Sequence, residues 1–243
     1  MPPSDRTFDV GVKVKTRMPM EAKSASPDST TAVKPTHWLA AFAAAVIVGH
    51  HTGFLLEPLG EVGTTRWADW IDLALPYAVV GCAAGALFAG RADRRAWLVL
   101  GASAVLYTQG HGIHLAANSI ANVAPGEPAH LWDEVVGHYL WYGGLAGIVI
   151  ALVLALGDLP RPALRVSIPL SLLFGFTVFT NSVEGGTALF GLASSTAFVV
   201  WGLRRRDRLA GLLVPTYGVA AAALLGWGAY WLGFPQFSEL GWL

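Results

Sequence analysis

The chain has 243 residues, of which 54% are hydrophobic and only 13% are charged, and its formal net charge is zero. Soluble domains carry about a quarter charged residues, so this composition excludes an ordinary soluble protein and favours a multi-pass membrane protein. A neutral chain lacks the basic excess that a phosphate-binding surface needs, so we expect no nucleic-acid partner. Cys82 is the only cysteine, which rules out an internal disulfide and a CxxC metal or redox motif.

Residues 1–36 differ in composition from the rest of the chain. They mix charged residues, proline, serine and threonine without a long apolar run, so they bury too little surface to offset the entropy lost on ordering. We expect a disordered cytoplasmic tail followed by one membrane domain at 37–243. The tail also lacks the apolar core of a signal peptide, so the first hydrophobic segment is expected to act as the targeting signal.

Seven segments of the membrane domain are long enough to cross a hydrocarbon core of about 30 Å, which takes about 20 helical residues. We expect these segments at 37–57, 70–90, 96–121, 131–157, 164–183, 186–204 and 209–233. The sequence therefore predicts an all-α integral membrane protein with a seven-transmembrane-helix bundle.

The basic residues predict the orientation of the bundle, because cytoplasmic loops are enriched in lysine and arginine. Apart from Arg66, every basic residue falls in the tail or in the alternate loops at 91–95, 161–165 and 204–208. This bias predicts a cytoplasmic N-terminus and an external C-terminus. We expect the protein in the plasma membrane, which is the cytoplasmic membrane if the source is bacterial. The segment 209–233 contains no lysine, which excludes a retinal Schiff base on the seventh helix.

Ionisable residues gather between Tyr107 and Tyr142, at the outer ends of two apolar segments. They fall on two helical stripes, which are Tyr107, His111, His114 and Asn118 on the first segment and His130, Glu134 and His138 on the second. Intramembrane ionisable side chains nearly always turn to the interior of a bundle, and the short linker at 122–130 makes the two helices antiparallel neighbours. We therefore expect the two stripes to face each other.

This mixed set of imidazoles and carboxylates is typical of an iron or zinc site inside a helix bundle. The predicted metal ligands are His51, His111, His114, Glu134 and His138. Soft copper(I) is disfavoured, because no cysteine lies nearby and the methionines are all in the tail. His50 and His51 point about 100° apart on a helix, so only one of them is expected to face inward.

Two further carboxylates are candidate catalytic groups. Asp133 lies on a different helix face from Glu134 and is expected either to orient His130 or to stay at the aqueous boundary. Glu184, in the predicted outer turn at 180–186, is expected to cap the following helix or to serve as a general base.

Several alternatives remain open at the level of sequence. The cluster is also compatible with a polar packing network, a b-type haem held by two imidazoles or a proton or ion pathway. As to function, we weigh a membrane metalloenzyme that hydrolyses or oxidises a lipid or another apolar substrate, a transport protein, and a structural subunit. The inner halves of the segments are almost purely apolar, for example at 98–104 and 145–156, which disfavours transport. The aromatic residues at 227–242 predict a belt at the outer interface.

Overall fold

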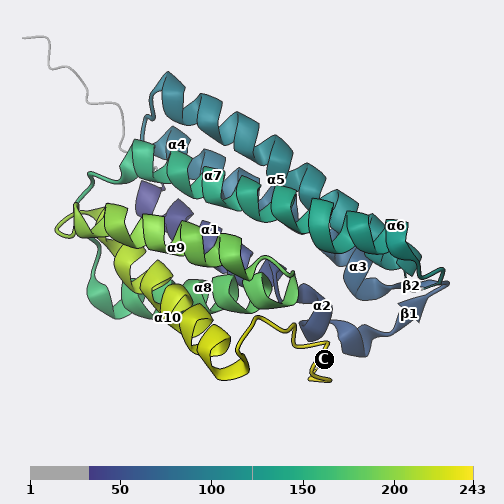
Figure 1. The fold of residues 1–243 in the computed structure, drawn as a ribbon. Coiled ribbons are helices and arrows are strands. Elements are labelled where there is room, and N and C mark those ends of the chain that lie inside the picture. Colours follow the sequence, from purple (N-terminus) through teal and green to yellow (C-terminus); the bar gives the residue numbers. More distant parts are fainter. Residues whose placement is uncertain (1–32, 122, 243) are drawn as a thin grey trace, which may run out of the picture. The chain divides into compact units, whose positions relative to one another are not determined.

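The computed structural model describes residues 33–121 and 123–242. Most of the expected tail lies outside the described residues. The described chain consists of helices, connecting loops and one short hairpin of two strands (Figure 1), with 3₁₀-helices at Glu57–Leu59 and Leu209–Leu212. The helices are α1 (Pro35–Gly49), α2 (Thr52–Leu55), α3 (Trp67–Asp72), α4 (Leu75–Ala89), α5 (Arg94–Ala121), α6 (Glu127–His130), α7 (His138–Leu156), α8 (Leu164–Glu184), α9 (Ala188–Leu203) and α10 (Leu213–Trp231). The strands β1 (Glu61–Val62) and β2 (Thr65–Arg66) pair antiparallel.

Local signals explain where several of these helices begin. Proline lies in the first turn of α1, α4 and α6, where its missing N–H would have no partner and its fixed φ suits a helix. The start of α5 is capped by Asp93, whose carboxylate accepts a hydrogen bond of 2.9 Å from the Ala96 N–H. Because the described elements are helices apart from one two-stranded hairpin, the all-α class predicted from the sequence is confirmed.

Each of the seven predicted segments is largely helical, although the first is interrupted after Gly49, and among the described residues four helical runs are both long and apolar enough to cross a membrane. These runs are Trp67–Ala89, Glu127–Leu156, Leu164–Glu184 and Leu209–Trp231. The apolar helices α1 and α9 are shorter, at 15 and 16 residues. Helix α5 has 28 residues, and the polar side chains of its second half lower its hydropathy. Length and composition therefore support a membrane protein with four candidate spans, and the other three predicted crossings stay predictions.

The bundle is organised around the close pairing of α5 and α7, which lie side by side (Figure 1). Small residues make this approach possible, because a Cβ added to Gly144 would overlap the backbone nitrogen of Tyr107 and one added to Gly147 would overlap the hydroxyl of Ser103. Helix α1 packs against both α4 and α8, and α10 packs against α8 and α9. The fully buried side chains of Leu87, Ile148 and Leu156 belong to the main apolar core.

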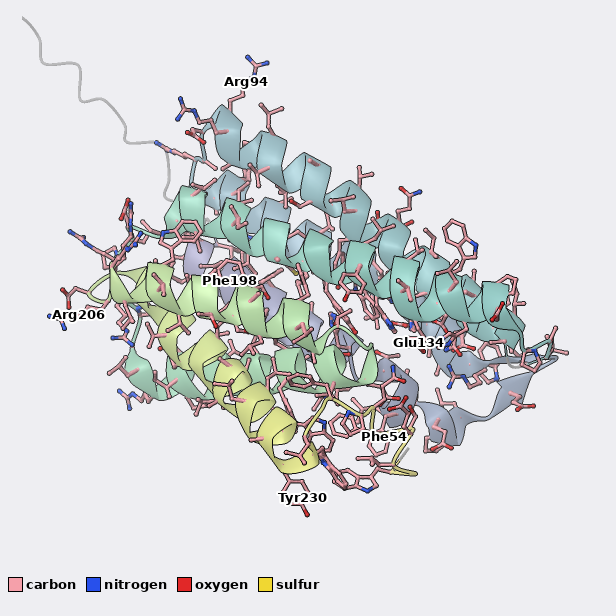
Figure 2. All side chains as sticks on the ribbon, in the orientation of Figure 1. Phe54, Arg94, Glu134, Phe198, Arg206 and Tyr230 are labelled. Carbon is pink, nitrogen blue, oxygen red and sulfur yellow. The ribbon has the colours of Figure 1, made fainter. Side chains whose placement is uncertain are left out.

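Two of the arginine-bearing loops, at 157–163 and 204–210, contact each other at one end of the bundle. The backbone N–H groups of Leu209 and Ala210 donate hydrogen bonds of 2.9 Å and 3.0 Å to the carbonyls of Leu159 and Gly157. Figure 2 shows Arg94 and Arg206 at this end and Glu134 toward the opposite one. The histidine cluster and the arginines are thus separated along the length of the helices.

One irregular segment leads into α7 and decides which side chains reach the site. Leu131–Gly137 is a π-helix rather than an α-helix. In an α-helix, Asp133 and His138 would point about 140° apart, whereas the i→i+5 bonding of a π-helix places residues five apart almost above one another. The alternative in which Asp133 stays at the aqueous boundary is therefore wrong. Asp133 is buried and shares a face with His138.

Candidate metal centre

His114, Asp133 and His138 form a group whose nitrogen and oxygen atoms all lie within 4.8 Å of one another. The histidine of α5 faces the other two residues across the α5–α7 pairing, and the two imidazole rings are 4.4 Å apart between centroids. The close approach of the two backbones sets this distance, because a Cβ on Gly137 would stand 2.9 Å from the His114 backbone nitrogen. Two imidazoles and one carboxylate thus converge from two helices.

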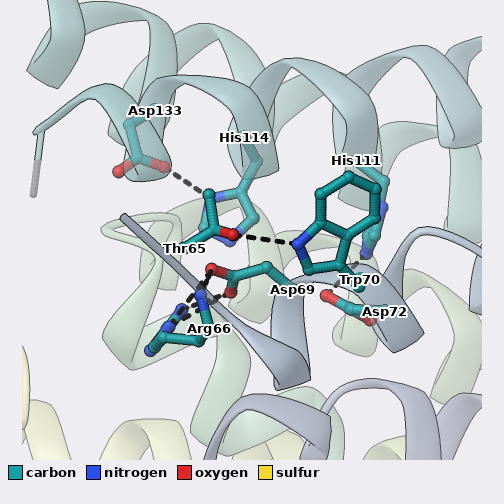
Figure 3. Close-up of polar contacts among 8 residues, drawn as sticks. All are labelled: Thr65, Arg66, Asp69, Trp70, Asp72, His111, His114 and Asp133. Atoms are coloured by element: carbon teal, nitrogen blue, oxygen red, sulfur yellow. Dashed lines mark hydrogen bonds and ion pairs between the residues drawn. The ribbon is translucent and has the colours of Figure 1, made fainter. Parts of the chain in front are cut away.

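The contact between His114 and Asp133 has an unusual geometry (Figure 3). Nδ1 of His114 lies 2.5 Å from Oδ1 of Asp133. The distance is that of an ion pair, and both atoms are buried. Metal–ligand bonds of about 2.0–2.2 Å place two ligands of one ion farther apart than this. A cation bound by both residues would therefore take the place of their direct contact.

Glu134 lies next to the group and contacts His138. Nδ1 of His138 is 3.4 Å from Oε2 of Glu134 and 3.2 Å from the Glu134 carbonyl oxygen. An N–H at Nδ1 that is directed at these oxygens leaves the lone pair on Nε2, the nitrogen that a metal would take. The side-chain amide of Gln236 donates a hydrogen bond of 3.0 Å to the same Oε2 atom. Glu134 therefore contacts the candidate ligand His138 but does not belong to the group of three residues.

Trp141 packs among four histidine rings. His50 stacks on it at 4.7 Å, His114 at 5.2 Å and His138 at 6.0 Å, and His111 meets it edge-on at 4.7 Å. The indole itself is 5% exposed. It shields the imidazoles from solvent and fixes their orientation by packing.

His111, which the sequence placed among the ligands, points to a different partner. Its Nε2 atom lies 3.1 Å from Oδ2 of Asp72 at the end of α3 (Figure 3). Asp72 was not among the predicted site residues. Its position could have indicated a role, because Asp72 lies two residues inside the apolar segment predicted at 70–90 and an ionisable group inside a span needs a partner. The other oxygen of Asp72, Oδ1, is buried without a hydrogen-bond partner among the described residues.

The predicted ligand His51 lies outside the group of His114, Asp133 and His138. Of the two adjacent histidines it is His50 that stacks on Trp141, while Nδ1 of His51 donates to the Ile47 carbonyl of α1 at 2.7 Å. The sequence left this choice open. Nδ1 of His50 donates to the Val46 carbonyl at 2.9 Å, and its buried Nε2 has no hydrogen-bond partner among the described residues.

Glu184 makes contacts that the sequence did not predict. Its Oε2 atom accepts hydrogen bonds of 2.8 Å and 3.2 Å from the backbone N–H groups of Phe237 and Ser238. The carboxylate therefore neither caps the following helix nor enters the histidine group. It holds the C-terminal segment, and Gln236 of that segment also donates to the Glu184 carbonyl at 2.5 Å.

No family model, no curated protein and no solved structure matches the chain. Over the described residues it is an all-α chain with four helices suited to crossing a membrane and with a His/Asp group that could hold a metal ion.

Proposed function

We propose that this chain is an integral membrane metalloprotein that binds Zn²⁺ or Fe²⁺ through His114, Asp133 and His138 and acts on a lipid or another apolar substrate. The observation that carries the proposal is the convergence of the three residues, because one ligand atom of each lies within 4.8 Å of the others. Asp133 and His138 are buried, and His114 is half-buried. A bound cation would give these polar atoms a common partner.

The ligand types support these two metals. Two imidazoles and one carboxylate suit zinc, and the same set with open positions is typical of non-haem iron(II). A catalytic zinc site commonly has three protein ligands and keeps a further position for water or substrate. A structural zinc site is closed by four protein ligands, so a three-residue group favours a catalytic role.

The residues around the group fit roles in such a reaction. A bound metal would supply Lewis acidity and a nucleophilic or redox-active centre. Glu134 would hold His138 in the orientation that directs Nε2 at the metal, as carboxylates do for metal-bound histidines. It would also offer a base at the edge of the site. Trp141 would exclude water from the imidazole side.

The proposed location follows from the apolar helices and the basic loops. Four helices have the length and composition of membrane spans, and the loops with Arg94 and Arg206 lie at one end of the bundle (Figure 2). We place this end in the cytoplasm and the histidine group in the outer half of the plasma membrane, or of the cytoplasmic membrane in a bacterium. Seven crossings would put the N-terminus inside and the C-terminus outside.

Elemental analysis of the purified, detergent-solubilised full chain tests the metal directly. We expect stoichiometric zinc or iron in the wild type and loss of most of it in both His138→Gln and His138→Ala. His130→Gln is the matched control, because His130 is exposed at the end of α6, directly before the π-helix. Metal retained by both His138 variants at the wild-type level would refute the proposal. Haem absorbance in the wild type would replace it with a haem protein.

A further inference from the structure

A cavity of about 370 Å³ lies between α1, α7, α8 and α10. Its wall is almost entirely apolar and includes Leu39, Phe42, Leu152, Leu170, Phe174 and Leu213. The hydroxyls of Ser167 and Thr216 at this wall donate to carbonyls of their own helices, at 3.1 Å and 2.8 Å. These two hydroxyls therefore already have acceptors. The other polar side chains of the lining are Thr36, His37, Ser171 and Tyr217. Because apolar side chains make up most of the wall, the cavity suits a hydrocarbon chain.

A second, separate cavity lies nearer the histidines. It has about 40 Å³ and is lined by residues that include Val46, His50, Tyr142 and Thr177. Tyr217 lines both cavities. Tyr142, in turn, stacks on His138 with ring centroids 5.5 Å apart. A single aromatic ring therefore separates the small cavity from the candidate metal centre.

The two cavities follow the same faces of the helices. On α1, Phe42 borders the large cavity and His50, two turns later, borders the small one. On α7, Leu152 borders the large cavity and Tyr142 the small one. The distance along α7 from Leu152 to His138 is about 21 Å at 1.5 Å per residue. The cavities thus lie in line along the bundle and end at the site.

We propose that the large cavity binds the hydrocarbon chain of a single-chain lipid of the long-chain fatty-acid class, with the polar head group directed past Tyr217 to the histidines. This inference rests on the proposed function and specifies its substrate. The large cavity offers the chain an apolar wall. The small cavity is lined in part by His50, whose buried Nε2 atom has no hydrogen-bond partner among the described residues, and this imidazole is the partner for a carboxylate or hydroxyl. A diacyl phospholipid would fit poorly, because one line of cavities has room for one chain.

The test uses palmitate that carries a photoreactive diazirine at its methyl end, bound to the full chain in detergent, with the crosslinks mapped by mass spectrometry. We expect crosslinks at the wall of the large cavity, and we expect unlabelled palmitate to compete.

Ala43→Phe should lower this labelling about tenfold, because the new ring fills the space of the chain and removes its apolar contacts. Ala44→Phe is the matched control, since Ala44 is the exposed neighbour of Ala43 on the same helix. Ala40→Phe fills the same cavity and replaces Ala43→Phe if that variant does not fold.

Three outcomes would overturn the inference. The first is that the cavity-filling variant, Ala43→Phe or its replacement Ala40→Phe, is labelled as strongly as the control Ala44→Phe. The second is crosslinking confined to other surfaces of the bundle. The third is equally strong labelling by a phospholipid with the same diazirine, which would assign the cavity to ordinary bilayer lipid.

His138→Ala separates this inference from the metal proposal, because the variant should still be labelled at the large cavity. Labelling without bound metal in the wild type would refute the metal alone, and bound metal without labelling would refute the chain site alone.

Discussion

Gly110 on α5 lies directly against the backbone of Trp141 on α7, so closely that a Cβ at position 110 would overlap the Trp141 nitrogen. Trp141 is the ring on which the histidines pack, and His114 lies one turn after Gly110. The spacing of the two helices therefore sets the spacing of the candidate ligands. No flexible side chain stands at this contact to give way, because the opposing atoms are backbone atoms.

Gly110→Ala should therefore damage both stability and the site. Overpacking typically costs about 1–3 kcal/mol, and we expect the upper part of this range, because two backbones must separate. The melting temperature in detergent and the bound metal should both fall. Gly112→Ala is the control, since a Cβ at Gly112 meets nothing within 4 Å and alanine is the better helix former. Equal melting temperatures for the two variants would contradict this account of the α5–α7 contact.

Much of this architecture could be predicted from the sequence, because it depends on local features such as long apolar runs, short linkers and polar stripes. Long apolar runs indicate helices by length alone. The short linker at 122–130 and the polar stripes indicate that His114 and His138 face each other, as they do at 4.4 Å between ring centroids. Both inferences need only the period of a regular α-helix.

The remaining features depend on departures from that period or on distant contacts. The π-helix at Leu131–Gly137 rotates Asp133 into the site, and a pattern based on 3.6 residues per turn cannot show it. Asp72 reaches His111 across 39 positions of sequence, and no local pattern encodes such a partner. Whether His50 or His51 faces inward depends on the rotation of a single helix about its axis, and two adjacent histidines do not determine that rotation.

Asp133 and Glu134 are neighbours with different expected roles, so matched substitutions should separate them. Asp133→Asn removes a ligand charge and should abolish most metal binding. Glu134→Gln disturbs only the residue behind His138 and should weaken metal affinity by about 10–100-fold. Competition with a chromophoric zinc chelator measures both affinities, and Glu127→Gln in the exposed first turn of α6 is the control. If Glu134→Gln loses all metal while Asp133→Asn keeps it, then Glu134 is the ligand and the assignment made here is wrong.

Gln236 links the C-terminal segment to two helices, and its removal should loosen this segment. The amide donates to Oε2 of Glu134 at 3.0 Å and to the Glu184 carbonyl at 2.5 Å. A hydrogen bond to a charged group contributes about 1.5–3 kcal/mol, so Gln236→Ala should speed amide hydrogen exchange at 236–242 by about tenfold or more. Glu239→Gln is the control, because Glu239 accepts a hydrogen bond only from within the segment, from the Gln236 N–H at 2.9 Å. Equal exchange rates in the two variants would show that the segment is held by its aromatic packing alone.

The orientation of the bundle can be tested at its two ends. The arginine-bearing end includes Asp207, between Arg206 and Arg208, and the opposite end includes Glu127 in α6; both residues are exposed. Positive charge is retained on the cytoplasmic side of a membrane. In a Cys82→Ala background, a membrane-impermeant maleimide should therefore label Glu127→Cys in intact cells and label Asp207→Cys only after the cells are permeabilised. The reverse pattern would invert the topology and move the histidine group to the inner half of the membrane. Labelling of both positions in intact cells would mean that an even number of crossings separates them, and the seven-crossing arrangement would fail.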